Sequence, residues 1–184
     1  MTIRGGAWAM VALSLLAMAL GAALMPVLTG LATGNLERPD PGASAMLVAA
    51  EAVKLVSAWV MWRLATMVPA SPTFGAVLLR IAAGALALAG LAGLAGVALV
   101  TPQAVEVVQM LALAALVATA AWGICCARAA TRSRPILFVA AGVTLVAAFA
   151  ALVQPAAGML AALSQIAFWS TLAAGRGKQG RAAG

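Results

Sequence analysis

Residues 47–64, LVAAEAVKLVSAWVMWRL, decide how this chain is interpreted. The segment is a long apolar run, typical of the middle of a membrane-spanning helix, yet it carries a carboxylate at Glu51 and an ammonium at Lys54. Residues three positions apart share a helix face, so these two charges are expected to pair. A charge at the centre of a membrane helix costs about 2.5–3.5 kcal/mol on insertion scales, and such residues are functional candidates.

The composition of the whole chain agrees with a membrane protein. Of its 184 residues, 65% are hydrophobic and 8% are charged. A soluble domain has about 25% charged residues, so this chain has too few charges to cover a water-facing surface. We therefore predict an all-α integral membrane protein with a single polytopic domain over residues 1–184. The connections, at most roughly 15 residues long, are too short to fold alone.

Six apolar runs approach the about 20 residues that cross roughly 30 Å of hydrocarbon. They lie near residues 7–28, 44–66, 75–100, 103–127, 135–153 and 156–174. We predict a six-transmembrane-helix antiparallel bundle. The segments ALVTPQA (98–104) and ALVQPAA (151–157) are similar, and both fall at a predicted outer turn. One possible arrangement of the bundle is therefore three successive helical hairpins. The last two runs are short. An alternative interpretation is that they form a single broken unit that does not fully cross the membrane.

The basic residues predict the orientation. If the spans alternate, Arg38 lies on one side, Lys54 lies within the membrane, and the other nine lie on the second side. These nine are Arg4, Arg63, Arg80, Arg128, Arg132, Arg134, Arg176, Lys178 and Arg181. Since cytoplasmic loops carry an excess of Lys and Arg, both termini are expected in the cytoplasm. The alanine-rich composition favours a bacterial chain, and hence the inner (plasma) membrane.

Prolines predict the outer turns. Pro26, Pro39, Pro41, Pro102 and Pro155 all fall at predicted outer connections. Proline lacks the amide hydrogen that a helix interior requires, so it favours helix ends. The first helix is therefore expected to end near residue 28, before an outer loop over residues 29–43.

The residues around Lys54 predict how its helix is rotated. Mostly small side chains flank Lys54 on its own face, so we expect the lysine to point into the bundle. These flanking residues are Ala50, Ser57, Ala58, Met61 and Ala65. We expect the side with Val53, Val56, Val60 and Leu64 to meet lipid.

Polar residues of the fourth run complete a candidate intramembrane site. Glu106 and Gln109 lie three residues apart near the outer end of that run and are expected to face the charged pair. The predicted site therefore consists of Glu51, Lys54, Ser57, Glu106 and Gln109. It is interpreted either as a polar pocket or ion path, or as a buried pair that fixes helix register.

Two further patterns concern packing and the interface. The third run, GALALAGLAGLAGVALV at residues 84–100, has a face of glycines that predicts close approach to another helix. Most of the five tryptophans lie toward the predicted cytoplasmic ends of their spans, and we interpret them as an aromatic belt. They are Trp8, Trp59, Trp62, Trp122 and Trp169.

The function classes are narrowed by what the sequence lacks. It has no histidine, no phosphate-binding glycine loop and no nucleophile elbow, and its two cysteines are adjacent. We expect no enzyme activity, no cofactor, no metal site and no nucleic-acid partner. The leading hypothesis is a non-enzymatic accessory or scaffolding membrane component, whose partners are the lipid bilayer and either another membrane protein or a second copy. The alternative is a small transporter or channel that uses Glu51 and Lys54.

Overall fold

The computed structural model describes residues 2–32, 39–67, 73–99, 102–129, 134–150 and 157–175. Within these ranges six α-helices account for almost every residue, which confirms the all-α prediction. The helices are α1 (Ile3–Ala32), α2 (Pro41–Met67), α3 (Thr73–Leu99), α4 (Pro102–Ala129), α5 (Arg134–Ala150) and α6 (Ala157–Gly175). Each predicted apolar run therefore corresponds to one helix, and the helix often extends a few residues beyond it.

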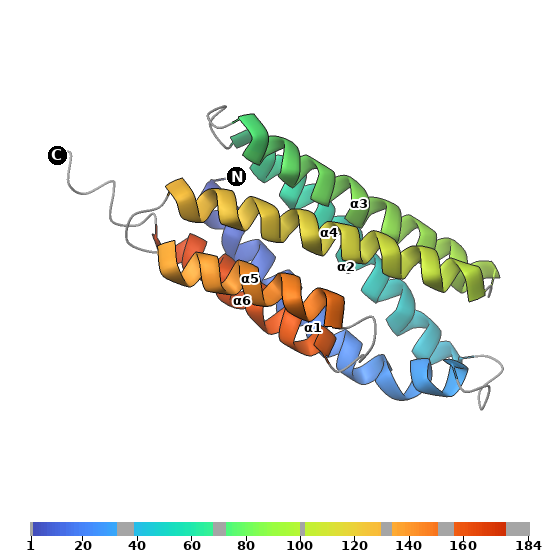
Figure 1. The fold of residues 1–184 in the computed structure, drawn as a ribbon. Helices are drawn as coiled ribbons and strands as arrows, with labels where there is room; N and C mark the ends of the chain where they lie inside the picture. The colour runs from blue at the N-terminus through green and yellow to red at the C-terminus, as the bar shows by residue number, and fades with distance from the viewer. Residues whose placement is uncertain are drawn as a thin grey trace.

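The contacts between helices place the six in a closed ring in chain order, and Figure 1 shows this bundle from the side. Each helix packs against the next one along the chain, in the opposite direction, and α6 packs back onto α1. The α2–α3 and α3–α4 contacts are the most extensive. Short connections favour this arrangement, because helices joined by a few residues form antiparallel hairpins. The end of the bundle where α1 begins and α6 ends is called the termini end below, and the opposite end is the far end.

Four of the described helices contain segments long and apolar enough to cross a membrane. These segments are Ile3–Val27, Pro41–Met67, Gly75–Ala95 and Val107–Cys125. The apolar segments of α5 and α6, Pro135–Ala150 and Gly158–Ala174, are shorter. At about 1.5 Å per residue they extend roughly 25 Å, somewhat less than the hydrocarbon thickness.

Local capping explains where α2 begins. The Asp40 Oδ1 atom accepts a hydrogen bond of 2.6 Å from the Ala43 backbone N–H, and the Asp40 carbonyl oxygen accepts one of 2.9 Å from the Ser44 N–H. An aspartate before a helix satisfies amides that have no partner inside it. Pro41 occupies the first helical position, where its missing amide hydrogen costs nothing.

The expected end of α1 is wrong. The helix continues through Pro26 to Ala32, so Thr29 lies in the helix and not in an outer loop. Proline removes one hydrogen bond inside a helix and often bends it, and α1 curves toward its end in Figure 1. Thr29 Oγ1 donates a hydrogen bond of 2.8 Å to the Met25 carbonyl oxygen. This side-chain bond lies close to the backbone hydrogen bond that Pro26 cannot form. The proline therefore marks a bend rather than a turn.

The hydrophobic core lies in the half of the bundle nearest the termini end. All six helices contribute to it, and the largest fully buried side chains are Trp169, Leu64, Leu79 and Leu137. Toward the far end α1 is covered less by its neighbours. Between residues 15 and 23 it exposes most of its side chains.

The predicted rotation of α2 is only partly correct. The small residues on the Lys54 face are buried or half-buried as expected, but Val53, Val60 and Leu64 are buried too, and only Val56 of that set is exposed. The reason is that α2 packs against both α1 and α3, so residues on more than one of its faces are covered. Its exposed face instead follows Ala52, Val56, Trp59 and Arg63.

Candidate functional site

The charged pair on α2 is formed as predicted. Lys54 Nζ donates hydrogen bonds of 2.7 and 2.8 Å to Glu51 Oε1 and Oε2, so one ammonium holds both carboxylate oxygens. The Glu51 side chain is 10% exposed and the Lys54 side chain 27% exposed. Hydrogen bonds in which both partners are charged are stronger than neutral ones. The two charges therefore neutralise each other on one helix without help from a neighbour.

The carboxylate of Glu51 packs against a glycine of α3. A Cβ atom added to Gly93 would overlap the carboxyl carbon and Oε2 of Glu51 and would lie 2.7 Å from Oε1. No residue larger than glycine fits there while the carboxylate keeps its position. The backbone of α3 thus forms the wall that buries the carboxylate of the pair.

A second glycine brings the two backbones together at the same place. A Cβ on Gly90 would lie 2.9 Å from Leu55 Cδ2 and 3.2 Å from the Glu51 carbonyl oxygen. Gly90 and Gly93 are about one helical turn apart, so they face α2 at successive turns. Small residues allow membrane helices to approach closely and gain van der Waals contact. The predicted glycine face is therefore a contact surface at these two positions, whereas a Cβ on Gly84 would meet nothing within 4 Å.

The remaining residues of the predicted site are placed as follows. Ser57 is buried on α2, about one turn from Lys54. Gln109 is exposed on α4. The backbone of Glu106 lies in α4, but its side chain is outside the described part of the structure. The grouping of Glu106 and Gln109 with the charged pair stays a prediction, while the described contacts of the pair come from α2 and α3.

A second polar contact, between α5 and α6, was not predicted from the sequence. Thr144 Oγ1 lies 2.6 Å from Ser164 Oγ, and both residues are buried. Each hydroxyl also lies within hydrogen-bond distance of a carbonyl oxygen on its own helix, at 2.8 Å for Ala140 and 2.9 Å for Ala161. Because each hydroxyl has one hydrogen, two of these three bonds can form at one time. The contact is the one hydroxyl–hydroxyl bond between helices in the described residues.

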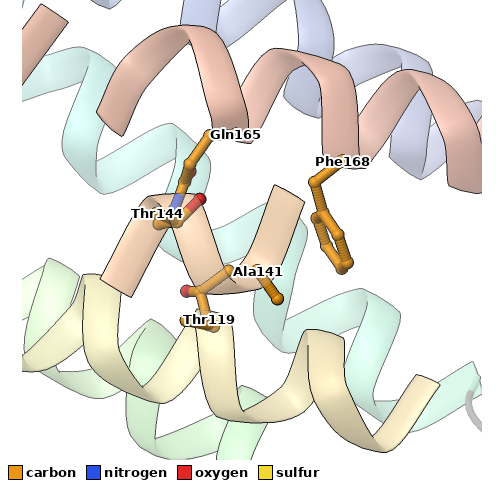
Figure 2. Close-up of a pocket in the computed structure, with 6 residues that line it drawn as sticks. Thr119, Ala141, Thr144, Gln165 and Phe168 are labelled. Carbon is orange, nitrogen blue, oxygen red and sulfur yellow. The ribbon is translucent and has the colours of Figure 1, made fainter. Parts of the chain in front are cut away.

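The same region contains a small, partly open cavity between α4, α5 and α6. Its volume is about 10 Å³, and it is lined by Thr119, Ala120, Ala141, Thr144, Gln165 and Phe168. Figure 2 shows the Gln165 side chain extending from α6 toward Thr144, with the Phe168 ring to one side. A space of this size holds about one water molecule, so it is no substrate pocket.

Helix position could have indicated this polar level. Thr119, Thr144 and Ser164 each lie roughly ten residues, or about 15 Å, from the termini end of their helices. Ser57 on α2 lies at the same depth. Counting polar residues from the predicted helix ends would therefore have placed them at one level near the middle of the bundle, although not in contact.

The aromatic-belt interpretation stays a prediction for three tryptophans and is wrong for two. Trp8, Trp59 and Trp62 are about half exposed, whereas Trp122 is 5% and Trp169 0% exposed. The two buried rings pack against each other at 5.4 Å between centroids, and both contact Phe168 edge to face. The Trp169 Nε1–H group has no hydrogen-bond partner in the described structure. These two residues belong to the core because α4 and α6 turn them inward.

The described residues contain no group of three or more acidic, histidine or cysteine side chains close enough to hold a metal ion. Cys125 is a half-buried free thiol at the termini end of α4. Comparison with protein-family models, with curated proteins and with solved structures finds no match.

Proposed function

We propose that the chain is a multi-pass integral membrane protein whose six helices cross the bacterial inner membrane with both termini in the cytoplasm. Four helices of sufficient length and apolarity support insertion. Large apolar side chains exposed around the bundle support it too, because water would solvate such a surface poorly. The described basic residues support the orientation, since Arg4, Arg63, Arg80, Arg128 and Arg134 all belong to the termini end.

Within that membrane the protein acts as a non-enzymatic accessory or scaffolding component, in contact with lipid and with another membrane protein or a second copy of itself. The observation that carries this proposal is that the Glu51 carboxylate is fully occupied by contacts within the protein. Both oxygens of Glu51 are bound by Lys54, and the carboxylate is packed against Gly93. Buried pairs of this kind seldom add net stability, but they can specify how two helices dock. The charges thus serve to set the α2–α3 interface.

A small transporter or channel is the second candidate. The observation in its favour is that Lys54 keeps 27% of its side chain exposed, so the lysine is only partly covered by the bundle. In this alternative a substrate anion or a proton would exchange with the Glu51 carboxylate. Ser57, which lies about one turn from Lys54 toward the termini end, would complete the polar path together with Glu106 and Gln109 on α4.

The experiment that separates the two candidates uses Glu51→Gln, Lys54→Met and the double variant beside the wild type. Thermal unfolding is measured in mild detergent, and solute or proton flux is measured in liposomes containing the same four proteins. For the accessory role we expect each single variant to be destabilised by about 2–3 kcal/mol, because one charge is left without its partner. The double variant recovers much of this loss, and no protein shows flux that depends on Lys54.

A different pattern would support transport. In that case wild-type liposomes show flux, and the double variant loses it although its stability has recovered. Single variants that are as stable as the wild type would contradict the docking role, since the pair would then contribute nothing to the interface.

A further inference from the structure

Two arginines lie over two exposed tryptophans at the termini end of α2 and α3. The guanidinium carbon of Arg63 is 5.6 Å from the centroid of the Trp59 ring, and that of Arg80, on α3, is 5.8 Å from the centroid of the Trp62 ring. Trp59 is 55% and Trp62 50% exposed. Since Trp59 and Trp62 are three residues apart on one helix, the four side chains form one continuous surface. This surface is called the Trp–Arg surface below.

Within the described part of the chain, no acidic side chain pairs with the charges of the Trp–Arg surface. Neither Arg63 nor Arg80 forms an ion pair with a described side chain. The described acids are elsewhere, since Asp40 caps α2 at the far end and Glu51 is held by Lys54. Two guanidinium groups therefore face solvent or headgroups with their N–H donors available.

We propose that the Trp–Arg surface binds the phosphate group of an anionic phospholipid. A guanidinium group held over an aromatic ring by a cation–π contact still has N–H donors for phosphate oxygens, which a guanidinium binds in a two-pronged geometry. The contact with the ring also restricts the arginine side chains before binding, which lowers the entropy lost when the phosphate is held. Two positive charges favour a headgroup with net negative charge over a zwitterionic one, whose own ammonium group they would repel.

The tryptophan rings distinguish a lipid from a free phosphate ion. They place apolar surface directly beside the two guanidinium groups, at the level where indole rings meet headgroups and the first acyl carbons. A phosphate ion makes no use of that surface, whereas a glycerophospholipid covers it. The inference rests on the proposed membrane insertion and not on the accessory role.

Native mass spectrometry of the full chain in mild detergent tests the proposal. Phosphatidylglycerol and phosphatidylcholine with identical acyl chains are added in equal amounts to the wild type, to Arg63→Gln/Arg80→Gln and to Arg4→Gln. Arg4 is the matched control, because it is exposed at the same end and has no recorded ring contact. We expect the wild type to retain phosphatidylglycerol preferentially. That preference falls about fivefold for each guanidinium removed from the surface, and it is nearly unchanged in Arg4→Gln.

Three results would overturn the lipid site. The double variant could keep the wild-type preference, Arg4→Gln could lose as much preference as the double variant, or millimolar inorganic phosphate could displace the lipid completely. The last result would assign the surface to a free phosphate. Binding of both lipids without preference contradicts this site alone, whereas binding of neither lipid contradicts the membrane insertion itself.

A fluorescence measurement keeps the test independent of the arginine variants. In Trp8→Phe, Trp59 and Trp62 are the exposed indoles, since Trp122 and Trp169 are buried. Brominated phosphatidylglycerol is expected to quench this variant more strongly than brominated phosphatidylcholine at equal mole fraction. Equal quenching by the two lipids would overturn the proposal.

Discussion

The Glu51 carboxylate of α2 lies against the bare backbone of Gly93 in α3, in space that any other side chain at position 93 would need. An ion pair inside a helical bundle usually requires a polar surrounding, because removing charges from water is costly. Here Lys54 satisfies the carboxylate from its own helix, and the neighbouring helix contributes only the absence of a side chain. This relationship makes the α2–α3 interface sensitive to single methyl groups.

Gly93→Ala tests that relationship directly. The added methyl group displaces the carboxylate from Lys54 or pushes α3 away, and we expect the free energy of unfolding to fall by about 1–3 kcal/mol. Gly84→Ala is the control, because its new methyl group would meet nothing within 4 Å. Thermal unfolding in detergent compares the two variants.

A double variant checks the cause. In Glu51→Ala/Gly93→Ala the carboxylate is gone, so the methyl group at position 93 fits and should cost much less than it does alone. This non-additivity measures the coupling of the two positions. Strictly additive losses would mean that the methyl group clashes with something other than Glu51.

The α5–α6 hydroxyl contact is expected to make a modest contribution. Thr144→Val keeps the shape of the side chain but removes the bond to Ser164, and hydrogen bonds between membrane helices average about 0.6 kcal/mol with a maximum of about 1.7 kcal/mol. Thr171→Val is the matched control, because Thr171 Oγ1 donates to the Ala167 carbonyl oxygen of its own helix. A loss in unfolding free energy for Thr144→Val that does not exceed that of the control would show that the contact contributes nothing.

Buried and exposed tryptophans should respond differently to truncation. Trp169→Ala leaves a large cavity in the core, where the ring is 0% exposed, and it should lower the unfolding free energy by about 3–5 kcal/mol. Trp59→Ala removes a 55% exposed ring and should cost about 0.5 kcal/mol or less. Chemical denaturation in detergent provides the comparison. Similar losses for both variants would contradict the assignment of Trp169 to the core.

The proposed orientation can be measured by cysteine labelling in a Cys125→Ala/Cys126→Ala background. Asp40→Cys places a thiol at the exposed far end, and Thr66→Cys places one at the exposed termini end. A membrane-impermeant maleimide added to intact spheroplasts is expected to label only Asp40→Cys, because basic ends face the cytoplasm. After permeabilisation both variants should react. The opposite pattern would place the termini outside.

Side-chain burial could not be predicted as well as helix position. The valine side of α2 was expected to face lipid, and Trp122 and Trp169 were expected at the interface, but Val53, Val60 and both tryptophans are buried. In a soluble helix an apolar stripe marks the buried face. These helices are apolar on every side, and lipid is as apolar as a protein core, so composition does not distinguish the two surroundings.

By itself, the sequence determined the features that depend on local chemistry. Long apolar segments must satisfy their own backbone hydrogen bonds, so they form helices. The basic residues had to gather at one end once the helices alternate, and Glu51 had to meet Lys54 because they are three residues apart on one helix. No contact between helices was needed for any of these outcomes.

The tertiary structure decided everything that depends on which helix lies beside which. It placed Gly93 against Glu51, joined Thr144 to Ser164, and brought Arg80 of α3 over Trp62 of α2. In the structure α1 also continues through Pro26, where the sequence suggested that the helix ends. These contacts follow from van der Waals fit, single hydrogen bonds and a cation–π contact between helices, which leave no periodic signal in helices that are apolar on most of their surface.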